Sequence, residues 1–173
     1  LRGSVTPQRS WWNLKSYDLS VTTNIEEKSI SGSNVIRYEV LKPGQSLQVD
    51  LQAPLIIDKV VQNGKELQVV HEGNAHFVQL ETEQEPGALN EIEVFYHGVP
   101  RQAVRAPWDG GFSWAEDSNG LPFVATSNQG LGASVWWPCK DHMYDENEEG
   151  MIMRYTVPEN VVAVGNGRLI DTK

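Results

Sequence analysis

The feature that most constrains this chain is the alternation of apolar and polar residues in short runs separated by turn signals. Strict alternation places apolar side chains on one face of a β-strand, whereas a helix needs a period near 3.6. The runs occupy residues 17–22, 28–40, 47–51, 56–61, 67–70, 77–80 and 92–96. Asn63-Gly64, Gly73-Asn74 and Pro86-Gly87 stand between runs and are typical of tight turns. About seven or eight strands at this spacing predict an all-β fold, either an antiparallel sandwich or a large curved sheet.

The character of the sequence changes after residue 98. Residues 98–150 are rich in Gly, Trp, Pro and Asp and contain few alternating runs. A long irregular segment in a compact domain is functional or disordered, and its large aromatic residues favour order. β character returns at residues 155–158, 161–164 and 168–170.

Charge and composition exclude several classes of function. The net charge is −9, whereas nucleic-acid binding needs clustered Lys and Arg. No apolar run approaches the roughly 18 residues of a membrane span. The 173 residues suffice for one domain with a sizeable core. The first residues lack the apolar stretch of a signal peptide, and we expect them to be a cut end.

Two histidines resemble a zinc-peptidase motif at first sight. His71 and His76 are five residues apart, whereas the motif His-Glu-x-x-His places its histidines four apart on a helix. Five residues rotate a helix by about 500°, which turns the imidazoles away from each other. A Gly-Asn turn signal also separates them. We therefore interpret them as part of a hairpin tip and expect no metal site in this chain.

Other groups with chemical potential are interpreted as structural. The acidic residues 141–149 lack the spacing and central glycine of a calcium loop, and predict a solvated loop or the start of a helix. Cys139, the single cysteine, excludes an internal disulfide and is interpreted as a packed residue rather than a nucleophile. No nucleophile elbow, phosphate-binding loop or dinucleotide motif is present.

Residues 126–141 are the segment best suited to a binding site. Gly130 and Gly132 allow backbone or ligand to approach closely, Trp136 and Trp137 carry a large apolar area, and the amide of Gln129 stands beside the first glycine. The segment is interpreted as one wall of a pocket whose other walls lie elsewhere. The remaining tryptophans are predicted to be core or interface anchors: Trp11, Trp12, Trp108 and Trp114.

The same segment resembles the N-terminal domain of gluzincin-type zinc aminopeptidases, the family of aminopeptidase N and leukotriene A4 hydrolase. Residues 138–141 match its Pro-Cys-x-Asp loop, and Val157-Pro158 and Asn166-Gly167 match its next two strand ends. Tyr17-Asp18-Leu19 and Gly32 fit its opening pattern. The resemblance covers nearly the whole chain. It implies that residues 1–173 are a single saddle-shaped antiparallel β-sandwich domain of a larger metallopeptidase.

The resemblance implies a noncatalytic role. In the family, zinc is held by a His-Glu-x-x-His helix and a later Glu, and a Gly-x-Met-Glu-Asn strand binds the peptide amino terminus. All of these would follow Lys173. We therefore expect no cofactor in this chain, zinc in the catalytic domain of the same polypeptide, and no activity of this chain alone. Its partners would be that catalytic domain, whose cleft it caps, and a peptide substrate.

One substrate contact carries over from the family, whose N-terminal domain lends a Glu or Gln to the first substrate subsite. The position falls on Gln129, flanked by Asn128 and Gly130, while Ser127 stands where the family often has a second Gln. A neutral Gln can accept a hydrogen bond from the substrate's ammonium group. The alternative is a loop amide that satisfies backbone groups.

Two other interpretations of the whole chain remain. It could be a freestanding β-sandwich module that binds peptide or carbohydrate through its Trp-rich loop, or a scaffold without a ligand. The family resemblance favours an exported location, periplasmic or extracellular, over a cytoplasmic one.

Overall fold

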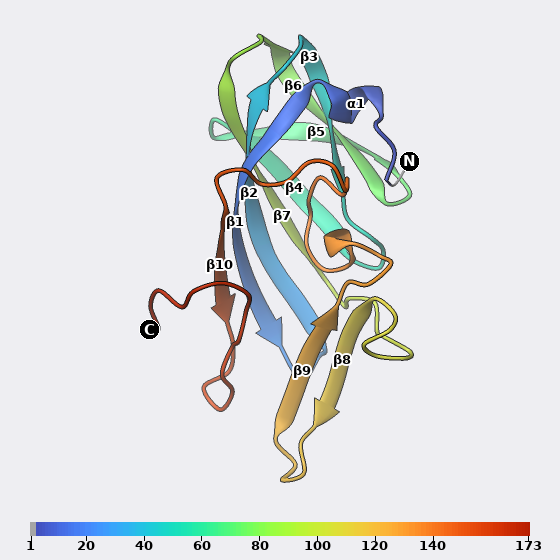
Figure 1. Ribbon diagram of the computed structural model, residues 1–173, viewed down its shortest axis with the longest axis vertical. Helices are drawn as coiled ribbons and strands as arrows, with labels where there is room; N and C mark the ends of the chain where they lie inside the picture. Colours follow the sequence, from blue (N-terminus) through green and yellow to red (C-terminus); the bar gives the residue numbers. More distant parts are fainter. Residues whose placement is uncertain (1–2) are drawn as a thin grey trace.

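Strands make up most of the molecule, as the alternation predicts (Figure 1). The computed structural model describes residues 3–173, so the expected cut end lies partly outside the described residues, at residues 1–2. The elements are α1 (Pro7–Ser10), β1 (Trp12–Asn24), β2 (Ser29–Val40), β3 (Gly44–Asp50), β4 (Ile56–Gln62), β5 (Lys65–Glu72), β6 (Ala75–Gln84), β7 (Leu89–Gly98), β8 (Gly111–Glu116), β9 (Pro122–Ser127) and β10 (Met151–Thr156), with a 3₁₀ turn at Ala133–Val135. The all-β prediction is confirmed.

Among residues 3–173, eight strands form one sheet in the order β10-β1-β2-β7-β4-β5-β6-β3. The predicted turns at residues 63–64 and 73–74 join β4 to β5 and β5 to β6. Neighbouring strands are antiparallel, as predicted, except at one edge of the sheet. There β10 runs parallel to β1, with Met151 opposite Tyr17.

The sheet curls around its own core because β5 changes partner along its length. Residues 65–67 of β5 pair with β4, and residues 68–72 pair with β6. β5 lies across the direction of β1 and β2 (Figure 1). One hydrophobic cluster, with side chains from β1 to β7, fills the space inside the curl. This arrangement gives the sandwich-like packing that the sequence predicts.

A β-bulge in β1 determines which of its residues face the core. Trp12 and Leu14 are buried before the bulge, and Leu19 and Val21 are buried after it. The register against β2 shifts between Leu14 and Ser16. One extra residue at this point moves the alternation by one position, so the same side of the strand stays apolar along its whole length.

Two predicted strands near the end of the chain are not formed, and those predictions are wrong. Residues 155–156 belong to β10, but residues 161–164 and 168–170 pair with no strand among the described residues. A strand needs a hydrogen-bonded neighbour, which these segments lack among the described residues. Most of their apolar side chains are exposed: Val162, Val164, Leu169 and Ile170.

The irregular segment contains a hairpin that the sequence analysis did not predict. β8 and β9 pair in register, with Trp114 opposite Val124, and project from the end of the sheet (Figure 1). The rest of residues 98–150 contains only turns, the 3₁₀ turn and isolated bridges, as expected. In the part of the chain that the structure describes, no helix is long and apolar enough to cross a membrane.

Candidate substrate-binding loop

The candidate site lies on the loop that leads from the β8–β9 hairpin back to the sheet. β9 ends at Ser127, and the carbonyl of Asn128 accepts hydrogen bonds from the amides of Leu131 at 3.1 Å and Gly132 at 2.9 Å. These two bonds close a compact turn over residues 128–132, directly before the 3₁₀ turn. The turn is thus held by its own backbone.

The turn exposes the three residues that the family resemblance assigns to substrate binding. Asn128, Gln129 and Gly130 all lie at the surface. With its amide oxygen turned toward the indole of Trp136, Asn128 accepts a hydrogen bond from Nε1 at 3.2 Å. The Gln129 side chain forms no hydrogen bond with residues 3–173. Gln129 is therefore open to a ligand.

A buried glutamine fastens the turn to the body of the domain. The side-chain amide of Gln52 donates to the carbonyl of Leu131 at 2.6 Å and to Ser134 Oγ at 2.8 Å. Its backbone amide donates to the carbonyl of Ser134 at 2.8 Å. Gln52 is buried, so its amide has lost its hydrogen bonds to water. The bonds to Leu131 and Ser134 replace them.

A buried carboxylate joins the far end of the loop to β3. Asp50 and Cys139 form an antiparallel bridge whose two N–O distances are 2.8 and 3.0 Å. The Asp50 carboxylate accepts from the amide of Asp141 at 3.0 Å and from Gln48 Nε2 at 2.8 Å, and forms an ion pair with Arg9. Asp50 and Arg9 are 2% and 1% exposed. Because an unpaired charge in this interior is costly, the network favours one arrangement of the loop.

Lys140 extends the anchor to β1. Its ammonium donates to the carbonyl of Trp12 at 2.6 Å, pairs with Asp145, and lies 4.0 Å from the centroid of the Trp12 ring. Its backbone amide donates to the hydroxyl of Tyr17 at 2.9 Å. Burial lowers the pKa of Lys140, and the hydrogen bond to Asp145 opposes this effect.

The paired tryptophans belong to the core. Trp136 and Trp137 are each 7% exposed. Trp137 meets Tyr17 edge-to-face at a centroid distance of 4.9 Å, and Trp136 meets Phe112 of β8 at 6.3 Å. Their interpretation as part of a pocket wall is wrong, because β1 and β8 already cover them. The tip of the loop is the part that can face a ligand.

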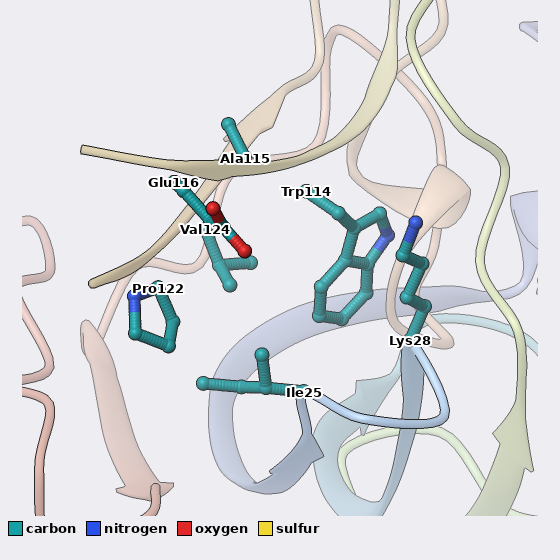
Figure 2. A pocket seen from close by; sticks show the side chains of 7 residues that line it. All are labelled: Ile25, Lys28, Trp114, Ala115, Glu116, Pro122 and Val124. Atoms are coloured by element: carbon teal, nitrogen blue, oxygen red, sulfur yellow. The ribbon is translucent and has the colours of Figure 1, made fainter. Parts of the chain in front are cut away.

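An open pocket of about 390 Å³ lies apart from this tip, between the β1–β2 turn and the β8–β9 hairpin (Figure 2). Ile25 and Lys28 from the turn face Trp114 and Val124 from the hairpin. None of the three predicted substrate-binding residues lines it. Of the other tryptophans, Trp11 and Trp12 lie in the core as predicted, whereas Trp108 is 74% exposed.

The groups interpreted as structural occupy structural positions. Cys139 is buried in the hydrophobic core. The acidic residues 141–149 form a loop and no helix, and Glu148 pairs with Lys15 of β1. Within residues 3–173, no cluster of three or more His, Cys, Asp or Glu side chains could hold a metal ion. The ligand set of a catalytic zinc centre therefore does not fit the described part of this chain.

Sequence reasoning missed the residues that anchor the loop. The alternation at residues 47–51 places Gln48 and Asp50 on the polar face of a strand, yet both are buried. The segment before β1 covers them, and Thr6 Oγ1 donates to Gln48 Oε1 at 2.6 Å. In the sequence, a strand with polar residues at every second position has the same pattern whether water or another segment of the chain covers its polar face.

Comparison with solved structures finds this fold in zinc metallopeptidases. The chain matches an M1 zinc metallopeptidase from Deinococcus radiodurans with a TM-score of 0.66 and 22% identity, over 91% of this chain and 34% of that one. It matches yeast LTA4 hydrolase in complex with Bestatin with a TM-score of 0.67 and 15% identity, over 86% of this chain and 23% of that one. No protein-family model and no curated protein matches the sequence.

The coverage indicates what part of those enzymes is matched. This chain spans about a third of the length of the bacterial enzyme and about a quarter of the yeast enzyme. At such identities the likeness concerns the fold, and function has to be argued from the site. The sequence resemblance is confirmed at this level: the chain has the fold of one domain of the M1 zinc metallopeptidases.

Proposed function

We propose that this chain is the noncatalytic N-terminal domain of a zinc aminopeptidase and caps its catalytic cleft. The observation that carries the proposal is the match to about a third of an M1 zinc metallopeptidase. The residues of the Pro-Cys-x-Asp segment support it, because they fasten the loop to the sheet. The Pro138 carbonyl accepts from Asn34 Nδ2 at 2.8 Å, Cys139 bridges to Asp50, and the Asp141 amide donates to the Asp50 carboxylate.

In this proposal the metal chemistry belongs to the rest of the polypeptide. A peptidase zinc polarises the scissile carbonyl and activates water. This chain instead helps to position the substrate and to exclude longer peptides from the cleft. A rigid sheet beside the cleft limits the length of peptide that fits at one end, and this restriction is what an exopeptidase requires.

The proposed substrate contact is Gln129, in the first subsite. Its amide oxygen can accept a charge-assisted hydrogen bond from the peptide's terminal ammonium group. Because backbone bonds and Gln52 hold the turn, little conformational entropy is lost when a substrate binds there. Asn128 is held by Trp136, so we assign Asn128 and Gly130 to the subsite through their backbone.

The kinetic test replaces Gln129 in the complete polypeptide. We expect Gln129→Ala to lower kcat/KM for peptides about tenfold, because one hydrogen bond to a charged group is lost. We expect Gln129→Glu to increase the preference for substrates with a free amino terminus over acetylated ones. Zinc content stays unchanged in both.

Gln68→Ala is the matched control, because Gln68 is an exposed glutamine on β5, away from the loop. It should leave the kinetics unchanged. Wild-type kinetics in Gln129→Ala would remove Gln129 from the site without touching the capping role.

A freestanding module that binds peptide or carbohydrate is the second candidate. The pocket in Figure 2 favours it, because Trp114 offers an aromatic surface beside Ile25 and Val124, with Lys28 and Glu116 as polar groups at the same site. The gene sequence after the codon for Lys173 separates the candidates. A His-Glu-x-x-His helix with a later Glu supports the cap, and a stop codon or an unrelated domain supports the module. We also propose that the protein is exported, as the family resemblance favours. A signal peptide encoded upstream would support this location.

A further inference from the structure

Two histidines that the proposed function does not use meet on the β5–β6 hairpin. Register places His71 of β5 directly opposite His76 of β6. A separation of five residues is wrong for two ligands on a helix, but across a two-residue turn it puts both side chains on the same face of the hairpin. The ring centroids are 5.0 Å apart.

Hydrogen bonding determines how His76 presents its ring. His76 Nε2 lies 3.0 Å from the carbonyl oxygen of Leu51. A carbonyl only accepts, so Nε2 carries the hydrogen and Nδ1 keeps a lone pair. That Nδ1 lies 2.7 Å from Nδ1 of His71, which therefore donates to it.

This arrangement is the one that metal-binding histidines share. One ring nitrogen of such a histidine donates to a carbonyl or carboxylate, which orients the other nitrogen toward the ion. His76 is 6% exposed, so its orientation is fixed by packing as well. His71 is exposed, which gives an ion a path from solvent.

We propose that His71 and His76 bind a divalent transition-metal cation, Zn²⁺, Ni²⁺ or Cu²⁺, through their two Nδ1 atoms, with water in the remaining positions. Imidazole nitrogens bind zinc at about 2.0–2.1 Å, so two of them at the tetrahedral angle on one ion lie ~3.3 Å apart. The two Nδ1 atoms are 2.7 Å apart and the ring centroids are 5.0 Å apart, so the nitrogens face each other along the line of the hydrogen bond. For an ion to bind, the exposed His71 ring has to turn so that its Nδ1 leaves this line, while His76 keeps its orientation. The proton on His71 Nδ1 moves through solvent to Nε2, so both rings bind in their neutral form.

The ion would cross-link β5 and β6 beside their turn. Because it binds the folded hairpin in preference to the unfolded chain, it should raise the melting temperature as its concentration rises. Two protein ligands leave the site open, unlike the closed four-ligand sites of structural zinc. The inference is independent of the proposed peptidase function.

The test titrates this chain with ZnCl₂, NiCl₂ and CuCl₂ and follows binding by isothermal calorimetry and melting by scanning calorimetry. We expect one ion per chain, a rise in melting temperature, and tighter binding of Cu²⁺ than of the other two ions. MgCl₂ should have no effect, because Mg²⁺ prefers oxygen ligands.

Variants of the chain's histidines locate the site. His71→Gln should lose both binding and the rise in melting temperature, and because His71 is exposed this variant should keep its fold, which near-ultraviolet circular dichroism checks. His97→Gln and His142→Gln are matched controls and should keep both effects. Absence of binding by the unmodified chain, unchanged binding by His71→Gln, or loss of binding in a control would each overturn the proposal.

Discussion

At the scale of single residues, the loop separates Gln129, the proposed substrate contact, from the groups that support it. Gln129 is exposed, whereas Asp50, Gln52 and Lys140 are buried beneath the loop. The support is polar, and each member has its own partner: Arg9 pairs with Asp50, Ser134 accepts from Gln52, and Asp145 pairs with Lys140. A polar anchor fixes direction as well as distance, so the loop cannot slide along the sheet as it could on a purely apolar contact.

The ion pair between Asp50 and Arg9 gives a prediction at this scale. Asp50→Ala leaves the Arg9 guanidinium in the core and removes the acceptor of the Asp141 amide. We expect the free energy of unfolding to fall by about 3–5 kcal/mol. Urea unfolding followed by tryptophan fluorescence measures the change.

The control is an exposed pair on the same sheet. Glu91→Ala breaks the contact of Glu91 with Arg37, in which both side chains are more than half exposed, and should cost less than about 1 kcal/mol. Equal losses in the two variants would mean that burial does not strengthen the Asp50 pair.

The same residues explain how much of the site the sequence could predict. The family resemblance indicated Gln129 because a local motif marks its loop, and Gln129 proved to be exposed. Asp50 was missed because its partner Asp141 is 91 positions away. A contact over that distance leaves no trace in a local pattern of apolar and polar residues.

At the scale of elements, the turn over residues 128–132 determines where Gln129 stands. Gly132 has φ 75° and ψ 173°, a region that residues with a Cβ rarely adopt. A Cβ at this position would lie 2.4 Å from Oδ1 of Asp141. Asp141 also accepts a hydrogen bond from Ser134 Oγ, so it can move aside only by breaking a contact of the loop.

Alanine substitutions at the two glycines compare a position that has room for a methyl group with one that does not. Gly130 has φ +73°, close to that of Gly132, but nothing lies within 4 Å of a Cβ there. We expect Gly130→Ala to lower the free energy of unfolding by about 1 kcal/mol and Gly132→Ala by up to about 3 kcal/mol. Urea unfolding of both variants gives the comparison. Equal losses would show that Asp141 yields to the new methyl group at no cost.

The elements also show where alternation works as a predictor and where it does not. It located β1 to β7, because each has one face in the core. It suggested strands at residues 161–164 and 168–170, where apolar residues find no partner strand among the described residues. It missed β8, although Phe112 and Trp114 alternate there with small residues, because the surrounding Gly-rich sequence obscured the pattern.

At the scale of the whole molecule, the curl of the sheet encloses phenol groups in the core. Tyr17, Tyr38 and Tyr96 are buried, and burial raises the pKa of each. The all-β class and the curved sheet follow from alternation and turn signals. The parallel edge does not, because β1 and β10 lie more than a hundred residues apart and only the folded chain brings them together.

Because of these buried phenols, the free energy of unfolding should change with pH in the alkaline range. Tyr38 is the residue whose contribution can be measured. Its pKa is raised from 10.0 to about 12, since burial outweighs the hydrogen bond from Gln62. Below pH 10 the phenol is protonated in both the folded and the unfolded chain, so its contribution to stability is complete. Between about pH 10 and pH 12 the unfolded chain releases the proton while the folded chain retains it. The free energy of unfolding should therefore fall by up to about 1.4 kcal/mol per pH unit on account of this residue.

Tyr38→Phe isolates this contribution. Gln62 Nε2 loses the Tyr38 hydroxyl, its acceptor at 3.1 Å, and keeps the carbonyl of Glu91 at 3.3 Å. One of its two N–H groups therefore loses its acceptor, which lowers the stability of the variant at every pH and leaves the comparison of slopes intact. Urea unfolding at a series of pH values from 9 to 12 should show a shallower decline in the variant than in the unmodified chain. The difference between the slopes corresponds to one proton, since Tyr17 and Tyr96 act equally in both proteins. Parallel curves would mean that Tyr38 ionises within the folded sheet, and that the core around it admits water.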